Sequence, residues 1–278
     1  MSKLTKAKAK AHQQACEILK KDVLTNDEKW FVLENWQESA THINTVAGAF
    51  FTPPDLARSF CIEVDGRLII DLCAGIGTLS FLYMEKCCFG PKPKITCVEI
   101  NPDYIAVGRK ILPEATWVQA SVFDLPDLEH FDCAISNPPF GNIKRGGLDA
   151  PRFTGRQFEY HVIDIASDLA DYGVFIIPQM SAPFRYSGEA TYRVAKDAGY
   201  LAFEQKTGIE LGANCGIDCS CSQDEWHGVA PKVEVVTVDF QEVRLRRAPK
   251  DDLRPEAQTT QDTECSEWQG DLFQEAAE

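Results

Sequence analysis

Apolar residues fall into two kinds of segment along the chain: short continuous runs, and longer stretches in which they recur every three or four positions. The short runs are bounded by turn residues and predict buried strands. These expected strands lie at 68–70, 94–100, 116–119, 131–135 and 173–178, with two more near 201–205 and 232–240. With helices between them, they predict an α/β fold: a doubly wound, mostly parallel, Rossmann-like seven-stranded sheet that ends in a hairpin.

The periodic stretches predict helices. They are expected over residues 2–21, 25–36, 158–170 and 188–199, with a short helix after Thr52. Thr25 followed by Glu28 has the spacing of a capping box. Thr52 is expected to cap the short helix with Pro53 at its first position, and Gly199 is expected to close the helix at 188–199.

Composition divides the chain into three segments. We expect an N-terminal helical extension (1–45), an α/β domain (46–247) and an acidic tail (248–278). The tail has few aliphatic residues, so it should be disordered. The extension carries six lysines over residues 2–21 against Glu17 alone. They form either a solvated helix face or a basic arm that follows a phosphate backbone.

Charge and cysteine content limit the possible partners. No apolar stretch approaches the length of a membrane span, and the Lys-rich N-terminus lacks the apolar core of a secretory signal, so a cytoplasmic protein without a membrane partner is expected. Eleven scattered cysteines are expected to be reduced thiols. The net charge of −14 argues against general attraction to nucleic acid, which makes the position of any basic cluster important.

The run 131–135 ends in Ser136-Asn137-Pro138-Pro139-Phe140-Gly141. Two prolines hold a stiff extended corner and leave carbonyls free beside an amide and an aromatic ring. A planar amine fits such a corner, since Asn137 Oδ1 and the Pro138 carbonyl can accept its two hydrogens while Phe140 covers its ring. The alternative is a strand-ending turn without chemistry.

A glycine turn links the first strand to a helix, in Asp71-Leu72-Cys73-Ala74-Gly75-Ile76-Gly77. Such glycines let the backbone approach a ligand at a helix N-terminus. The second strand ends at Glu99, where βαβ nucleotide folds place an acid that binds ribose hydroxyls. The turn and the acid together predict a nucleotide-like cofactor.

At these motifs the chain resembles S-adenosylmethionine-dependent N6-adenine DNA methyltransferases, over residues 45–240. Asn137-Pro138-Pro139-Phe140 matches the catalytic tetrapeptide of that family. The resemblance implies a class I methyltransferase domain over 46–247, with S-adenosyl-L-methionine as cofactor. It implies that Asn137, Pro138, Pro139 and Phe140 are catalytic, and that the cofactor-binding residues are Phe51, Thr52, Asp71, Ala74, Gly75, Gly77, Glu99, Ile100, Ser121 and Val122.

Methyl transfer to adenine requires the base to leave its stack, and Phe140 would supply the replacement surface. A Gly-rich loop beyond the corner holds a cluster of basic residues and one acid, Asp149. The cluster, which we expect to hold the flanking phosphates, consists of Lys144, Arg145, Arg152 and Arg156.

The chain departs from the family in two ways. Ser121 stands where the family usually has an Asp that binds the cofactor's adenine, so a weaker contact is expected there. Little sequence after residue 180 remains for a separate target-recognition domain. We therefore expect relaxed sequence specificity, as in an orphan enzyme of a bacterial phage or plasmid.

Other substrates share the same chemistry. RNA adenine, or a protein glutamine amide, presents the same planar amine, and an inactive nucleic-acid-binding module is a further alternative. Cytosine C5 methylation is excluded because it needs a cysteine nucleophile, usually after a proline, and the chain has no Pro-Cys pair.

Two shorter signals remain. Cys215, Cys219, Cys221 and His227 are either zinc ligands or part of a plain Gly-rich loop; the spacing is not a standard finger, and we expect no metal. The tail holds Gln269, Leu272 and Phe273, which resemble the short peptide that docks bacterial proteins on the replication sliding clamp.

Overall fold

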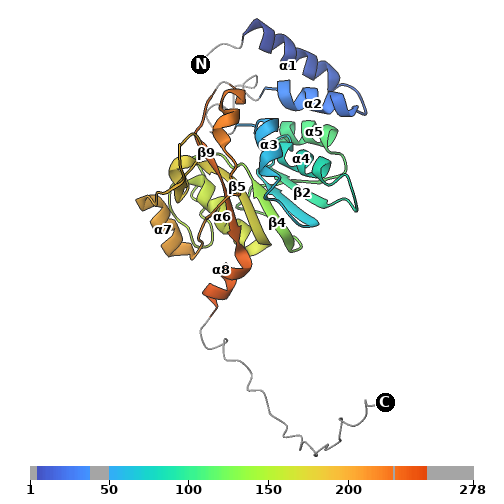
Figure 1. Cartoon of the computed structure of the whole chain (residues 1–278). Coiled ribbons are helices and arrows are strands. Elements are labelled where there is room, and N and C mark those ends of the chain that lie inside the picture. Colours follow the sequence, from blue (N-terminus) through green and yellow to red (C-terminus); the bar gives the residue numbers. More distant parts are fainter. Residues whose placement is uncertain (1–4, 38–49, 228, 249–278) are drawn as a thin grey trace, which may run out of the picture. The chain divides into compact units, whose positions relative to one another are not determined.

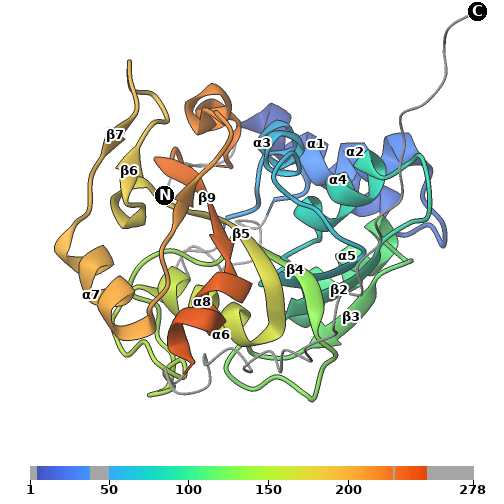
Figure 2. The same cartoon turned by 60° about the horizontal axis from the view of Figure 1, so that its bottom comes forward.

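A central sheet organises the computed structural model, which describes residues 5–37, 50–227 and 229–248. Within these residues, seven strands pair in the order β3-β2-β1-β4-β5-β9-β8 (Figures 1 and 2). The strands are β1 (Leu68–Leu72), β2 (Lys94–Glu99), β3 (Thr116–Gln119), β4 (Phe131–Ser136), β5 (Ala170–Pro178), β8 (Gly212–Ala213) and β9 (Val233–Asp239). Strands β1 to β5 are parallel, and β9 is antiparallel to both β5 and β8. The predicted doubly wound, mostly parallel seven-stranded sheet is confirmed.

Helices cover both faces of the sheet (Figure 2). They are α1 (Lys6–Ile18), α2 (Asn26–Asn35), α3 (Pro54–Phe60), α4 (Thr78–Lys86), α5 (Pro102–Ile111), α6 (Phe158–Leu169), α7 (Ala198–Thr207) and α8 (Phe240–Arg247). The described residues also form two 3-10 helices, η2 (Gln179–Ser181) and η3 (Cys219–Glu225). Ile69 joins the core beneath α3 to α5 and Ile70 joins the core beneath α6 to α8. Because successive strand residues face opposite cores, the strands are continuous apolar runs.

The N-terminal helices pack on the α3–α5 face of the sheet. The predicted capping box is confirmed: Thr25 Oγ1 accepts from the Glu28 N–H, and the Glu28 carboxylate accepts from the Thr25 N–H at 3.0 Å. After α2, the Trp36 ring lies 5.6 Å from that of Phe51 and 5.8 Å from that of Tyr104 on α5. This aromatic contact places α2 beside the segment that leads into α3.

The region after β5 differs from prediction. The helix expected at 188–199 is wrong: residues 188–197 form no helix, β6 (Phe184–Arg185) pairs with β7 (Arg193–Val194), and Gly199 lies in the first turn of α7 rather than at a helix end. The strand expected at 201–205 is also wrong, because Tyr200, Phe203 and Thr207 recur at helical spacing and bury one face of α7. The sixth strand of the sheet in chain order is the two-residue β8, which lies at the edge of the sheet beside β9.

The short helix α3 begins one residue later than expected. Pro54 is its first residue and Pro53 its cap, without a side-chain capping bond. The Thr52 hydroxyl, expected to cap this helix, instead accepts from the Asn137 side chain. Thr52 therefore belongs to the site rather than to the helix.

Met1–Arg247 is one compact unit of the chain, separate from Ala248–Glu278. The expected boundary at 45/46 falls outside the described residues, as do nearly all of the tail and its Gln269, Leu272 and Phe273. In the part of the chain that the structure describes, no helix is long and apolar enough to cross a membrane.

Candidate cofactor and substrate site

The carboxyl ends of β1, β2 and β4 meet at one edge of the sheet, because these strands are parallel neighbours. A narrow cavity of about 30 Å³ opens there. Its lining residues are Phe50, Phe51, Thr52, Asp71, Cys73, Ala74, Gly75, Thr78, Leu79 and Asn137. Gly75 of the glycine turn and Asn137 of the Pro-Pro corner thus face the same space.

The glycine turn adopts backbone angles that side chains disfavour. Gly75 has a φ of +58° and Gly77 a φ of +86°. A Cβ on Gly75 would lie 3.3 Å from the Phe51 ring, so Phe51 covers the turn closely. Helix α4 begins after Gly77 without a side-chain cap. Its first N–H groups therefore suit a ligand carboxylate at the cavity.

Asp71 contributes an unsatisfied acceptor. It is 1% exposed, and its Oδ2 accepts from Ser80 Oγ at 2.7 Å. Its Oδ1 is buried and has no hydrogen-bond partner within the described residues. Burial raises the pKa of Asp71 to about 7, and the charge of Glu99 adds to the shift. A ligand ammonium in the cavity would supply the missing donor and restore the ionised form.

Glu99 ties β2 to the glycine turn. Its Oε2 accepts from the Gly75 N–H at 2.9 Å, and its Oε1 accepts from the N–H groups of Ile100 and Asn101, each at 2.8 Å. Burial raises the pKa of Glu99, while these backbone donors oppose the shift. The Ile100 side chain next to it is exposed, which leaves an apolar surface beside the acid.

The other residues expected at the cofactor lie beyond β3. Ser121 Oγ accepts from the Phe123 N–H at 3.3 Å in a local turn, and Val122 is buried in the core of the α6–α8 face. Asp124 is exposed. Neither Ser121 nor Val122 lines the cavity at Asp71.

The Asn137 side chain is held in one orientation. Its Nδ2 donates to the Phe50 carbonyl at 3.0 Å and to Thr52 Oγ1 at 2.8 Å. A carbonyl can only accept, so the amide nitrogen must face Phe50. Asn137 Oδ1 is left buried without a partner among the described residues. It is the second unsatisfied acceptor of this cavity.

The rest of the corner is anchored by its neighbours. Ser136 Oγ donates to the Leu72 carbonyl, which joins the ends of β4 and β1. Phe140 is half-buried against the core on the α3–α5 face. Gly141 has a φ of +79°, and its N–H donates to Glu159 Oε2 at 2.9 Å.

Of the four basic residues after the corner, two form ion pairs and two do not. Arg145 is 15% exposed in its side chain, pairs with Asp149 at 2.9 Å and donates to the carbonyls of the loop itself. Arg152 pairs with Asp164 and Asp168 of α6, at 3.0 and 2.7 Å. Lys144 and Arg156 are exposed and form no ion pair within the described residues. These last two are the cations available to a ligand.

Sequence reasoning missed the buried polar residues of α6 that hold this loop. Glu159, which accepts from the Gly141 N–H, is one of them. His161 is another: it accepts from the Ala150 N–H at 3.0 Å and faces the Gly155 carbonyl at 2.9 Å. Burial lowers the pKa of His161, which suits this acceptor role. Asp164 accepts from the N–H groups at 152 and 153, at 2.7 and 2.9 Å. The available signal was the presence of Glu159, His161 and Asp164 among the apolar residues of this helix.

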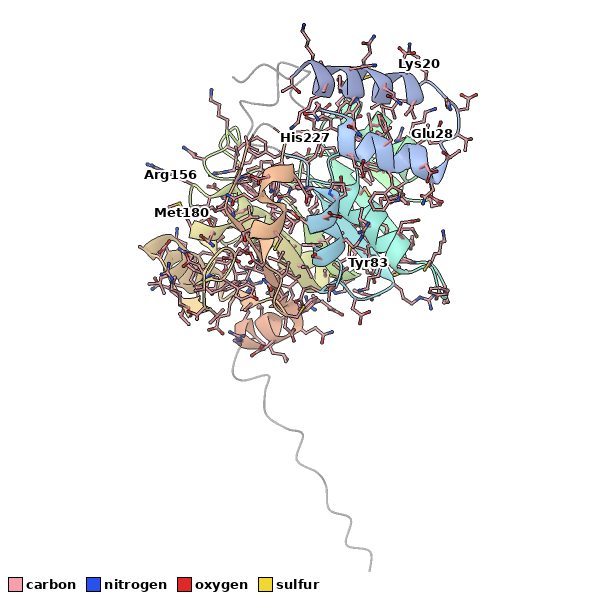
Figure 3. The ribbon with its side chains drawn as sticks, turned by 45° about the horizontal axis from the view of Figure 1, so that its top comes forward. Lys20, Glu28, Tyr83, Arg156, Met180 and His227 are labelled. Carbon is pink, nitrogen blue, oxygen red and sulfur yellow. The ribbon has the colours of Figure 1, made fainter. Side chains whose placement is uncertain are left out.

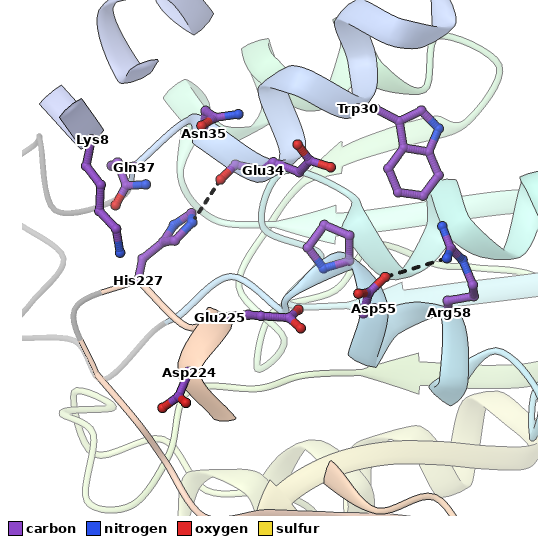
Figure 4. Close-up of a pocket in the computed structure, with 11 residues that line it drawn as sticks. Lys8, Trp30, Glu34, Asn35, Gln37, Asp55, Arg58, Asp224, Glu225 and His227 are labelled. Carbon is purple, nitrogen blue, oxygen red and sulfur yellow. Dashed lines mark hydrogen bonds and ion pairs between the residues drawn. The ribbon is translucent and has the colours of Figure 1, made fainter. Parts of the chain in front are cut away.

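A second hollow of about 430 Å³ lies between α1, α2, α3 and η3 (Figure 4). Carboxylates outnumber cations among its lining residues, which are Lys8, Trp30, Glu34, Asn35, Gln37, Pro54, Asp55, Arg58, Asp224, Glu225 and His227. Arg58 pairs with Asp55 at 3.5 Å, and His227 Nε2 lies 3.1 Å from the Glu34 carbonyl. Sequence reasoning did not anticipate this hollow.

The zinc alternative finds no support in the residues that the structure describes. No group of three His, Cys, Asp or Glu side chains there is arranged to hold a metal ion. Cys219 is buried, whereas Cys215 and Cys221 are exposed. The segment is built as a loop around η3.

No protein-family model matches the chain, and no curated protein matches it. Solved structures do. A type I restriction-modification methyltransferase subunit from Streptococcus thermophilus is 17% identical with a TM-score of 0.52, over 77% of our chain and 48% of its own. A Listeria monocytogenes protein assigned to the class I S-adenosylmethionine-dependent methyltransferases is 12% identical with a TM-score of 0.52, over 80% of our chain and 69% of its own.

These likenesses establish the fold, which is that of the class I methyltransferases. Our chain spans about half the length of the S. thermophilus subunit.

Proposed function

We propose that this protein transfers a methyl group from S-adenosyl-L-methionine to the exocyclic N6 amine of adenine in DNA, with relaxed sequence specificity. One observation carries the proposal. Asn137 Oδ1 is an unpaired buried acceptor, held in place by two donor bonds from Nδ2, in the same cavity as the glycine turn. An unpaired buried acceptor costs free energy unless a ligand satisfies it. A planar amine is a donor of matching geometry.

The residues around the cavity fit the cofactor. Asp71 Oδ1 is an unpaired acceptor for its ammonium, the N-terminus of α4 suits its carboxylate, and Glu99 stands at the strand end where a ribose is bound in such folds. When bound, S-adenosylmethionine supplies an electrophilic methyl group on sulfur. We assign its binding to Phe51, Thr52, Asp71, Ala74, Gly75, Gly77, Glu99, Ile100, Ser121 and Val122.

The chain's own catalytic contribution is positioning. The adenine N6 lone pair is delocalised into the ring, so the amine is a poor nucleophile. If Asn137 Oδ1 and the Pro138 carbonyl accept both amine hydrogens, a pyramidal nitrogen is favoured and its lone pair is directed away from the ring. Phe140 stacks on the flipped base. Pro139 keeps the corner stiff.

A nucleic-acid substrate is favoured because cations free of ion pairs follow the corner in the loop, and DNA is favoured by the resemblance of the sequence to N6-adenine DNA methyltransferases. Lys144 and Arg156 are the exposed pair, while Arg145 and Arg152 also keep the loop in shape. Phosphate contacts of this kind carry no sequence information. We propose relaxed specificity because the cations available to the substrate would contact phosphates rather than base edges.

Radiolabelled methyl transfer tests the proposal. Purified protein is incubated with labelled S-adenosylmethionine and either duplex DNA, single-stranded DNA, RNA or a glutamine-containing protein, and the labelled product is identified by nucleoside or peptide analysis. We expect N6-methyladenine in DNA. Label in RNA or glutamine only, or none at all, would contradict the assignment.

Asn137→Ala is the matched variant. It removes the proposed acceptor, so we expect loss of transfer while cofactor binding, measured by calorimetric titration, changes little. Asn26→Ala, at an exposed position of α2, is the control and should behave as wild type. Full turnover by Asn137→Ala would refute the role of the corner.

A further inference from the structure

Met180 is a large apolar residue in an unusual position. It is 75% exposed, whereas its neighbours Gln179 and Ser181 are 8% and 7% exposed. All three form η2, the turn that leaves the carboxyl end of β5. An exposed methionine on a mobile loop needs no explanation, but this turn is held on both sides.

Buried side chains fix the turn before Met180. The Gln179 side chain donates to Glu234 Oε1 at 2.8 Å and to the Ser187 carbonyl at 2.9 Å. The Gln179 N–H donates to the Lys232 carbonyl at 2.9 Å. Glu234 also accepts from the Ser187 N–H and hydroxyl, so it fixes the chain beyond the turn as well.

The turn is also fixed after Met180, by side chains of α6, one of which holds the Asn137 corner. Ser181 Oγ donates to Glu159 Oε1 at 2.6 Å, and the Tyr160 hydroxyl donates to the Ser181 carbonyl at 2.7 Å. The other oxygen of the same carboxylate, Glu159 Oε2, accepts from the Gly141 N–H. One carboxylate therefore joins the turn that carries Met180 to the corner that carries Asn137.

Arg156 is held close to the same point of the chain. The Phe158 N–H donates to the Gly141 carbonyl at 2.9 Å, and Asn142 pairs with Gln157. The free cation thus lies next to the start of α6, beside the corner. Figure 3 shows Arg156 and Met180 projecting from the same edge of the molecule.

We propose that Met180 enters the base stack of duplex DNA and fills the space that the target adenine leaves when it turns into the corner. This inference rests on the proposed function. Removing a base from the stack leaves an apolar gap, and inserted apolar side chains such as Met fill gaps of this kind. The unbranched thioether adapts to irregular apolar space, and the main chain that carries it is already fixed, so only the side chain has to be ordered on insertion.

The exposed apolar residue Leu245 lacks this setting. Leu245 is 62% exposed on α8, the helix that follows β9. Asp239 at the end of β9 pairs with Tyr172 near the start of β5, so α8 begins at the amino end of β5. It lies at the opposite edge of the sheet from Asn137. Leu245→Ala is therefore a control that removes comparable exposed apolar surface away from the site.

The experiment compares a mixed-sequence duplex with its adenine-containing strand alone, using Met180→Ala, Met180→Leu, Leu245→Ala and wild type. Since a single strand has no stack to keep open, we expect Met180→Ala to lose about tenfold in initial rate on the duplex and no more than about twofold on the strand. Met180→Leu and Leu245→Ala should stay within about twofold of wild type on both. A 2-aminopurine at the target position should fluoresce less with Met180→Ala than with wild type.

Equal rates of Met180→Ala and wild type on the duplex would overturn the inference while leaving the proposed function intact. Equal losses on duplex and single strand would overturn it as well, because they indicate a defect of the corner or of folding. If the wild type methylates the single strand but not the duplex, the inference about Met180 fails and the proposed function stands. If it methylates no DNA, the inference falls together with the proposed function.

Discussion

Replacing Glu159 tests whether one buried carboxylate holds the site together. Glu159 is 1% exposed and accepts from the Gly141 N–H and from the Ser181 hydroxyl, at 2.9 and 2.6 Å. Glu159→Ala leaves both donors without their acceptor. Glu159→Gln keeps the shape of the side chain, because the amide oxygen can accept from Gly141 while the amide nitrogen donates to Ser181 Oγ.

The expected magnitudes differ between the two variants. A buried polar group left unpaired costs about 1–3 kcal/mol, so Glu159→Ala should lower the free energy of unfolding by about 2–6 kcal/mol. At about 2–4 °C per kcal/mol for a domain of this size, Tm should fall by at least about 4 °C. Glu159→Gln should cost less than about 1 kcal/mol.

The assay combines thermal unfolding, followed by circular dichroism, with methyl-transfer rates and calorimetric cofactor binding. Glu159 does not line the cavity at Asp71, so Glu159→Ala should lower kcat while the cofactor Kd stays within about twofold of wild type at a temperature well below Tm. Glu159→Gln should recover most of kcat. An unchanged Tm for Glu159→Ala, or equal damage from the two variants, would refute the reasoning.

Two further predictions concern charge. Burial raises the pKa of Asp71 to about 7 in the folded protein, above the value of about 3.9 in the unfolded chain; the folded state therefore holds the extra proton between these values, and stability without cofactor should fall as pH rises from about 4 to about 7. Asp71→Asn lacks this titrating group, so the Tm of the variant should rise relative to the Tm of wild type as pH increases from about 4 to about 7. Parallel plots of Tm against pH for the two proteins would contradict the raised pKa of Asp71. Replacing both Lys144 and Arg156 with Ala should weaken DNA binding and lower the slope of log K against log salt by about 0.9 for each phosphate that is no longer neutralised, as measured by fluorescence anisotropy. Lys92→Ala, at an exposed position between α4 and β2, is the control, and an unchanged slope in the double variant would rule out phosphate binding by these two residues.

The sequence predicted the features that depend on local rules and on parallel-sheet topology. The Thr25–Glu28 capping box needs only a spacing of three residues. The meeting of Gly75 with Asn137 follows because β1 and β4 are parallel neighbours and both motifs follow their carboxyl ends.

Features that depend on distant partners were not predictable. The loop arginines look alike in sequence, yet Arg152 is paired because α6 presents Asp164 and Asp168 to it. Thr52 looks like a helix cap until Asn137, 85 residues away, is placed beside it. In the same way, a five-residue window at 201–205 hides the helical period of α7, which becomes clear only when Tyr200 and Thr207 are included.

The anchors on α6 touch the loop at 141–157 mainly through its main chain. Glu159, His161 and Asp164 bind backbone groups at 141, 150, 152, 153 and 155. Exposed side chains such as Asn142 and Leu148 are therefore uncoupled from what keeps the loop in shape. Libraries randomised at these positions should retain folded protein in most members, so the outer surface of this loop can be varied widely while the corner that it follows keeps its shape.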